Sequence, residues 1–434
     1  MNFRNFAALL IAMPLINNAY AQQAQTSFKF DFGPGKVAAG YTQVLPTAVY
    51  SAESGFGFDQ GTTPVGTDRG GKDALKSDFV SSDKPFLFSV KVPEGNYKVS
   101  VTFGDAKEAT ETSIKAESRR LMVYHQTTKP GKFLTKTFIV NIMNKKISNG
   151  TMVAARPKLD WDDRLTLEFD NTTALDAIEI TKVDDQVNMF LAGNSTVVNQ
   201  DYEPWASWGQ MIPVMFKPGV AVCNYAESGL ALSSFVGQRR LAKILDIAKP
   251  GDFVFVEFGH NDEKEKGPND GADKSYTQRL RSFAAAVKEK GCQLVILTPT
   301  ARRSFGPDGK IINSHVTPLG DYPQAARNVA ADLGVPLIDL TAQATIMYET
   351  LGVEESKKLF VFNPDTKQLD NTHFNVFGAY QMAKIVAQGI RKNKLSIAKY
   401  LVDAPTFDPA HPDPVGSFLW PVGPKASMTP PAGN

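Results

Sequence analysis

The sequence predicts a two-domain protein, in which an all-β sandwich precedes an α/β domain with a central parallel sheet. Three observations lead to this prediction. The chain has 434 residues, more than one hydrophobic core usually holds. Up to about residue 183 the apolar segments are short and alternating. After residue 186 apolar runs alternate with helix-like segments, so we expect the domain boundary at 184–185.

The first residues have the layout of a cleavable secretory signal. Arg4 precedes an apolar run over residues 6–16, and the small-residue triplet Ala-Tyr-Ala follows at 19–21. The run is too short to span a bilayer. We therefore expect residues 1–21 to be removed on export to the periplasm or the cell exterior, and we expect no membrane insertion.

Residues 22–184 are predicted to form the β-sandwich. Alternating segments such as 85–92 (PFLFSVKV), 97–104 (YKVSVTFG) and 164–170 (RLTLEFD) are typical of half-buried strands. Turn residues such as Pro-Glu-Gly-Asn at 93–96 separate these segments. Many short strands at this spacing favour a sandwich.

Residues 185–400 are predicted to form the α/β domain. Helix-like segments such as 276–291 and 376–392 separate strongly apolar runs. These runs are 188–193 (NMFLAG), 220–226 (VAVCNYA), 252–259 (DFVFVEFG), 292–299 (CQLVILTP) and 335–340 (VPLIDL). Strands that are apolar on both faces indicate a parallel sheet covered by helices. Residues 401–434 carry eight prolines and are predicted to form an extended tail.

Composition excludes several classes of function. A formal charge of +2 argues against nucleic acid as a partner. Cys223 and Cys292 are the only cysteines, and each lies in an apolar run, so a disulfide and two buried thiols both remain open. The chain has no Cys-x-x-Cys and no clustered Cys/His set, so we expect no structural zinc.

Two candidate site residues follow predicted strands. Ser195 comes directly after the run 188–193, where open α/β sheets place their active sites. Taken alone, a serine there is more often a helix N-cap. Gly229 follows the run 220–226, and a glycine lets its backbone N–H approach a ligand closely. A loop that starts a helix explains Gly229 equally well.

Two further elements add an amide and a carboxylate–imidazole pair. The sequence Gly-His-Asn-Asp at 259–262 follows a strongly apolar strand, and Asn261 can present its amide to an anionic oxygen. Packing does not explain four small or polar residues at that point. Asp370 and His373 have a spacing that can place a carboxylate beneath an imidazole, although a simple turn has the same pattern.

Together these elements resemble the four sequence blocks of the SGNH/GDSL hydrolase superfamily, over residues 186–398. The sequences FGHND at 258–262, TPTARR at 298–303 and WASWGQ at 205–210 are similar to the rhamnogalacturonan acetylesterase branch. The half beginning FKFDFGPG at 28–35 is similar to the galactose-binding-like sandwich that precedes this esterase domain in some bacterial members. The resemblance implies a three-layer α/β/α fold for the second domain.

The resemblance also implies roles for the candidate residues. Ser195 would be the nucleophile, His373 the general base and Asp370 the partner that orients it. The oxyanion hole would consist of the backbone N–H groups of Ser195 and Gly229 and the side chain of Asn261. Neither a metal ion nor another cofactor is implied.

The sequence departs from the family pattern at two places. Asn194 stands where the Gly-Asp-Ser block has Asp. That Asp is not the triad carboxylate, and Asn keeps its shape and one acceptor oxygen, so we expect an altered loop or pH profile. An inactive protein is the alternative. Leu230 and Ala231 follow Gly229 where many relatives carry Arg-Ser, which changes the expected substrate contacts.

The function that follows is a secreted serine esterase that removes acetyl groups from acetylated rhamnogalacturonan, with a polysaccharide or oligosaccharide as its partner. Arg302 and Arg303 can pair with galacturonate carboxylates or can be solvated surface charges, and His260 is a third candidate substrate contact. Deacetylation of xylan or another hemicellulose is an alternative. A catalytically inactive carbohydrate-binding protein on the same fold is another. We expect a monomer.

Overall fold

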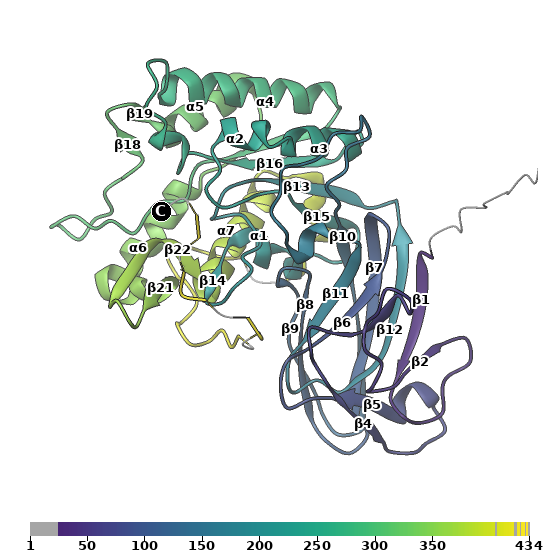
Figure 1. Cartoon of the computed structure of the whole chain (residues 1–434). Helices are drawn as coiled ribbons and strands as arrows, with labels where there is room; N and C mark the ends of the chain where they lie inside the picture. The colour runs from purple at the N-terminus through teal and green to yellow at the C-terminus, as the bar shows by residue number, and fades with distance from the viewer. Residues whose placement is uncertain (1–24, 404–405, 421–422, 426, 430, 433–434) are drawn as a thin grey trace, which may run out of the picture.

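The two halves of the chain form a β-sandwich and a three-layer α/β/α domain, which confirms the predicted fold class (Figure 1). The computed structural model describes residues 25–403, 406–420, 423–425, 427–429 and 431–432. The predicted secretory signal, residues 1–21, lies outside the described residues.

The sandwich consists of antiparallel strands apart from the β1–β2 pair, which is parallel. One sheet has the order β10-β7-β12-β1-β2, with β4 and β5 attached through β12, and the other has the order β3-β6-β11-β8-β9. The strands are β1 (Ser27–Phe32), β2 (Thr42–Val44), β3 (Phe56–Asp59), β4 (Val65–Asp68), β5 (Asp78–Ser81), β6 (Phe86–Lys91), β7 (Gly95–Asp105), β8 (Thr110–Ala116), β9 (Arg120–Thr128), β10 (Lys132–Ile142), β11 (Arg164–Phe169) and β12 (Leu175–Val183).

Alternation along the strands builds the sandwich core. In β7, Tyr97, Val99 and Val101 are fully buried, whereas Lys98 between them is exposed. Because successive side chains of a strand point to opposite faces, this spacing puts one row inside and leaves the other in solvent. The inward rows of both sheets meet in a phenylalanine-rich core that includes Phe88.

The second domain is built on a parallel sheet with the order β15-β13-β16-β17-β20. Alternate residues of its strands enter two different cores. Met189 and Leu191 of β13 pack with α1, α6 and α7, whereas Phe190 and Ala192 pack with α2 to α5. Figure 1 shows α4 and α5 on one side of the sheet and α7 on the other. The strands are therefore buried on both faces, as their continuous apolar runs indicate.

The bounds of these elements are as follows. The strands are β13 (Val187–Gly193), β15 (Val220–Asn224), β16 (Phe253–Glu257), β17 (Gln293–Leu297) and β20 (Leu337–Ile338). The helices are α1 (Trp208–Met211), α2 (Leu232–Gly237), α3 (Arg240–Ile247), α4 (Thr277–Glu289), α5 (Tyr322–Leu333), α6 (Leu340–Glu355) and α7 (Val376–Lys392). A smaller sheet contains β14 (Trp205–Ala206), β21 (Phe360–Asn363) and β22 (Gln368–Asn375), and β18 (Val316–Thr317) pairs with β19 (Gly320–Asp321).

The strand order has a topological switch point at the carboxyl end of β13. The chain leaves β13 for β15 on one side and then crosses to β16 on the other. Ligands of open α/β sheets bind at such switch points, because the diverging connections leave a gap there. Ser195, Gly229 and Asn261 follow β13, β15 and β16 respectively, so the fold brings these three predicted site residues to the same edge.

The two halves of the chain share a buried interface. The sandwich strands end at Val183 and the parallel sheet begins at Val187, on either side of the position that the sequence predicts for the boundary. The segment after β10 nevertheless packs into the core of the second half, through Met143 and Trp161. This long-range packing has no counterpart in the local hydrophobic pattern.

The proline-rich tail lies against both halves. Phe418 stacks on Tyr124 of the sandwich and on Tyr380 of α7, with ring centroids 4.6 and 4.4 Å apart. Cys223 and Cys292 are both buried free thiols. Within the described part of the chain, no helix combines the length and the apolar character needed to cross a bilayer.

Candidate active site

Ser195, His373 and Asp370 form a hydrogen-bonded chain. His373 Nε2 lies 2.8 Å from Ser195 Oγ, and His373 Nδ1 lies 2.9 Å from Asp370 Oδ2. Asp370 Oδ1 accepts the backbone N–H groups of Thr372 and His373, both at 2.8 Å. With Nδ1 protonated and donating to the carboxylate, Nε2 is left to accept the serine proton. The ring of Trp205 packs edge-on against the imidazole, with ring centroids 5.9 Å apart.

Asp370 is held in its ionised form. Burial raises the pKa of its carboxyl group, but the hydrogen bond and charge of His373, together with two backbone amides, outweigh burial and lower the pKa below its ordinary value. An ionised carboxylate orients the imidazole and stabilises the imidazolium that forms when serine loses its proton.

The predicted oxyanion-hole residues lie on adjacent loops that are tied together. Gly229 has a φ of +81°, a conformation that glycine adopts without strain. Asn261 Nδ2 donates to the carbonyl of Leu230, the residue after Gly229, at 3.1 Å. The neighbouring Asp262 accepts backbone N–H groups from Leu232 at 2.9 Å and from Gly259 at 3.0 Å. These bonds hold the amide of Asn261 beside the Gly229 loop.

Asn194 lies within a buried network that already contains the carboxyl group of Glu257. Its Oδ1 accepts both the backbone N–H and the hydroxyl of Thr196, at 3.1 and 2.9 Å. Its Nδ2 is buried and has no hydrogen-bond partner among the residues that the structure describes. Glu257, at the end of β16, accepts a hydrogen bond from Trp208 Nε1 at 2.6 Å, and its Oε1 lies 2.9 Å from Thr196 Oγ1, which shares its one hydroxyl hydrogen between Asn194 and Glu257. The neighbouring strand of the sheet therefore provides a carboxyl group to this network, and burial raises the pKa of that group.

Asn194→Asp is expected to change acetate release only modestly, while lowering the free energy of unfolding by about 1–3 kcal/mol at neutral pH. The new oxygen replaces an Nδ2 that has no partner in the described residues, and it enters the network of Glu257. Burial raises the pKa of such a carboxyl group, so the folded state binds its proton more tightly than the unfolded state. The loss of stability should therefore shrink as pH falls.

Denaturant unfolding of both proteins at pH 5 and 7 measures this effect, and acetate release by both, with Ser195→Ala as the blank, measures activity. Activity that appears only after Asn194→Asp would show that the natural sequence is inactive.

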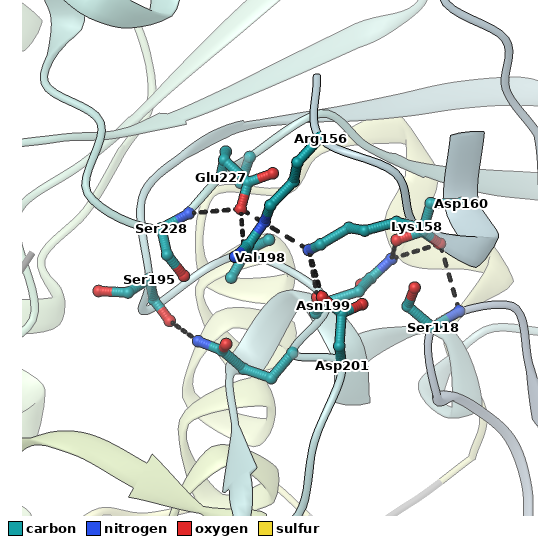
Figure 2. A network of polar contacts seen from close by, with 12 residues as sticks. Ser118, Arg156, Lys158, Asp160, Ser195, Val198, Asn199, Asp201, Glu227 and Ser228 are labelled. Carbon is teal, nitrogen blue, oxygen red and sulfur yellow. Dashed lines mark hydrogen bonds and ion pairs between the residues drawn. The ribbon is translucent and has the colours of Figure 1, made fainter. Parts of the chain in front are cut away.

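Residues of the sandwich support the loop that follows the nucleophile, and sequence reasoning missed them. Within this loop, Gln200 Nε2 donates to the carbonyl of Ser195 at 2.9 Å. From the sandwich, Arg119 Nη1 donates to the carbonyl of Gln200 at 3.2 Å. Lys158 Nζ donates to the carbonyl of Asn199 at 2.9 Å (Figure 2). A buried lysine or arginine usually has a polar or charged partner. The sequence alone does not show which loop contains that partner.

Arg303 forms hydrogen bonds to the loop that carries Asp370. Its Nη1 donates to Asn371 Oδ1 at 3.0 Å, and its backbone N–H donates to the carbonyl of Asn371 at 2.8 Å. Its other side-chain nitrogens donate to Ser356 Oγ and to the carbonyl of Val353. Every side-chain nitrogen of Arg303 is therefore engaged by the protein, and a substrate contact by Arg303 stays a prediction.

Arg302 and His260 lie in a neighbouring polar cluster. Arg302 forms an ion pair with Glu263 at 2.6 Å, and its Nη1 lies 3.1 Å from His315 Nδ1. His260 is buried, with its ring 4.5 Å from the ring of His315 in an edge-on arrangement. Burial and nearby cations lower the pKa of His260 well below its ordinary value, so it is neutral. Substrate contacts by these two residues stay predictions.

Two family models match the chain. Residues 28–155 match the galactose-binding-like domain of β-agarase/YXIM-like esterases, and residues 191–379 match the GDSL-like lipase/acylhydrolase family. The chain is 40% identical over 225 residues to rhamnogalacturonan acetylesterase RhgT of Bacillus subtilis, an alignment that covers 50% of this chain and 94% of RhgT.

Two other relatives from Bacillus subtilis also match. The probable rhamnogalacturonan acetylesterase YesY is 32% identical over 218 residues, which cover 50% of this chain and 97% of YesY. The uncharacterised esterase YxiM is 26% identical over 405 residues, which cover 89% of this chain and 96% of YxiM. The protein described here belongs to the GDSL-like lipase/acylhydrolase family, carries a galactose-binding-like domain ahead of its catalytic domain, and is a carboxylic ester hydrolase.

Proposed function

We propose that the protein is a serine carbohydrate esterase that removes acetyl groups from acetylated rhamnogalacturonan. The observation that carries the proposal is the hydrogen-bonded chain from Asp370 through His373 to Ser195, at the switch point of the sheet. The similarity to RhgT, whose name gives this polymer as its substrate, supports the choice of acetyl ester and of pectic polysaccharide.

The proposed reaction has two halves. In the first, Ser195 Oγ attacks the acetyl carbonyl carbon while His373 Nε2 takes the serine proton. The carbonyl oxygen becomes an oxyanion, which accepts hydrogen bonds from the N–H groups of Ser195 and Gly229 and from the amide of Asn261. The bond from carbon to the sugar oxygen then breaks, the sugar hydroxyl leaves with the proton from His373, and the acetyl group remains on Ser195.

In the second half, water hydrolyses the acetyl-enzyme. His373 takes a proton from the water molecule as the water oxygen attacks the acetyl carbon, and the same donors bind the second oxyanion. The bond to Ser195 Oγ breaks, His373 returns the proton to serine, and acetate leaves. Asp370 keeps the imidazole in the required tautomer throughout both halves.

We also propose that the protein is exported, on the basis of the signal-like residues 1–21. Export suits an enzyme that acts on a polysaccharide outside the cytoplasm. N-terminal sequencing of the exported protein should then begin at Gln22.

Acetate release from defined polymers tests the proposed function. We expect wild type to release acetate faster from acetylated rhamnogalacturonan than from acetylated xylan, with Ser195→Ala as the blank for spontaneous hydrolysis. Faster release from xylan would instead make the protein a hemicellulose deacetylase. Equal release by wild type and Ser195→Ala on every polymer would favour a carbohydrate-binding protein without esterase activity.

A further inference from the structure

A loop of the sandwich domain reaches the edge of the active site. Arg156 and Lys158 lie in the segment between β10 and β11, and Figure 2 shows both pointing toward the carboxylate of Glu227. Arg156 Nη2 donates to Glu227 Oε1 at 2.8 Å. The same oxygen accepts the backbone N–H of Ser228 at 3.0 Å, and the next residue is the oxyanion-hole candidate Gly229. Arg156 is therefore joined to the oxyanion loop through a single side chain.

Glu227 has two buried cationic partners besides Arg156. Arg240 Nη2 lies 3.3 Å and Lys158 Nζ lies 3.7 Å from its carboxylate oxygens, and both side chains are almost fully buried. Lys158 also lies 3.6 Å from Asp201. Burial alone would raise the pKa of Glu227, but these three cations outweigh it and lower the pKa. Glu227 is thus ionised, and two of its three cationic partners are buried.

Arg156 is the exposed member of this group. Its side chain is 51% exposed, against 2% for Lys158 and 1% for Arg240. Within the described chain the bond to Glu227 is the one hydrogen bond of its guanidinium, which leaves further N–H groups for a ligand. An exposed arginine joined to the oxyanion loop suits a carboxylate, which arginine binds through paired N–H groups.

We infer that Arg156 is a specificity-determining residue, which binds a uronate carboxylate of the substrate chain while the acetyl group lies at Ser195. The inference rests on the proposed function and deepens it, because it assigns recognition of the acidic sugar to the sandwich domain.

Arg156→Ala tests the inference through the difference between charged and neutral substrates. We expect kcat/KM for acetylated rhamnogalacturonan oligosaccharides to fall by about 10-fold, mainly through KM, since a charge-assisted hydrogen bond is lost. Hydrolysis of acetylated xylo-oligosaccharides and of 4-nitrophenyl acetate should stay unchanged. Arg156→Lys should recover part of the loss. Raising the salt concentration should increase KM of wild type for the charged substrate and affect the alanine variant less.

Arg239→Ala is the matched control. Arg239 is another exposed arginine, and its Nη1 donates to the carbonyl of Met152 at 3.2 Å, in the segment that leads to Arg156. The Arg239→Ala substitution also removes one positive charge from an exposed arginine, and hydrolysis of the charged and the neutral substrates should stay unchanged.

The outcomes separate the inference from the proposed function. If wild type deacetylates rhamnogalacturonan and Arg156→Ala does so with the same KM, the inference fails and the proposed function stands. An equal loss on charged and neutral substrates would make Arg156 a structural support and would also overturn the inference. If wild type releases no acetate from the charged polymer, the proposed function and the inference fail together.

Discussion

Replacing Ser195 by alanine is expected to lower kcat for ester hydrolysis by about 10⁴- to 10⁶-fold. The variant keeps the oxyanion donors but has no oxygen to attack the acetyl carbon, so only water attack on the bound ester remains. Ser195 makes one side-chain hydrogen bond to His373 in the described structure, and we expect little change in thermal stability. Hydrolysis of 4-nitrophenyl acetate and thermal unfolding of the two proteins measure these effects.

A double variant shows whether Ser195 and His373 act as one unit. His373→Ala alone should lower kcat nearly as much as Ser195→Ala does, because a serine hydroxyl without a base is a weak nucleophile. Combining the two should add almost nothing, since each single change already removes the same step. Multiplicative losses in the double variant would contradict the proposed roles of both residues.

Asp370→Asn is expected to lower kcat by about 10⁴-fold while leaving the fold intact. The asparagine oxygen can still accept the backbone N–H groups that Asp370 Oδ1 accepts, so the loop keeps its shape. The amide that replaces Oδ2 is a donor, and it favours the tautomer in which Nδ1 of His373 has no proton. Nε2 then carries the proton and cannot accept one from Ser195. The loss of the negative charge also removes stabilisation of the imidazolium.

Asp408→Asn is a matched control for this variant. Asp408 and His411 have the same three-residue spacing, and His411 Nδ1 lies 2.8 Å from Asp408 Oδ2. This second pair is exposed to solvent, so its substitution should leave the rate at the wild-type level. Measurement of kcat for both variants separates loss of the orienting carboxylate from a general effect of removing an Asp–His pair. A near-normal rate for Asp370→Asn would contradict its role.

Hydrophobic periodicity predicts the fold of both halves because it reports which faces of each strand are buried. The apolar run at 188–193 is buried on both faces of the sheet, and the alternating run at 97–104 is buried on one. The same pattern places Ser195 at a strand end. It carries no information on contacts between the halves, so the support that Arg119 and Lys158 give to the nucleophile loop could not be predicted.

The substrate contacts that the sequence suggests, by Arg302, Arg303 and His260, stay predictions. Arg302 and Arg303 follow an apolar strand, which indicates a position at the active-site edge. Their environments depend on Glu263 and on the 353–356 segment, which neutralise or engage them. Arg156 follows no apolar strand, and a packed interface between the halves brings it to Glu227. Long-range packing decides which exposed charge faces a substrate.

The two Asp-x-x-His sequences separate local from tertiary determination. In both, the first carboxylate oxygen accepts the backbone N–H two residues later, and the second lies within 2.9 Å of the ring three residues later. Short-range geometry is sufficient for this pair, so the sequence by itself determines it. Only the tertiary structure decides that His373 meets Ser195, 178 residues away, whereas His411 faces solvent. The physical reason is that β22 and β13 are held together by burial of apolar surface in a shared core, which no local pattern encodes.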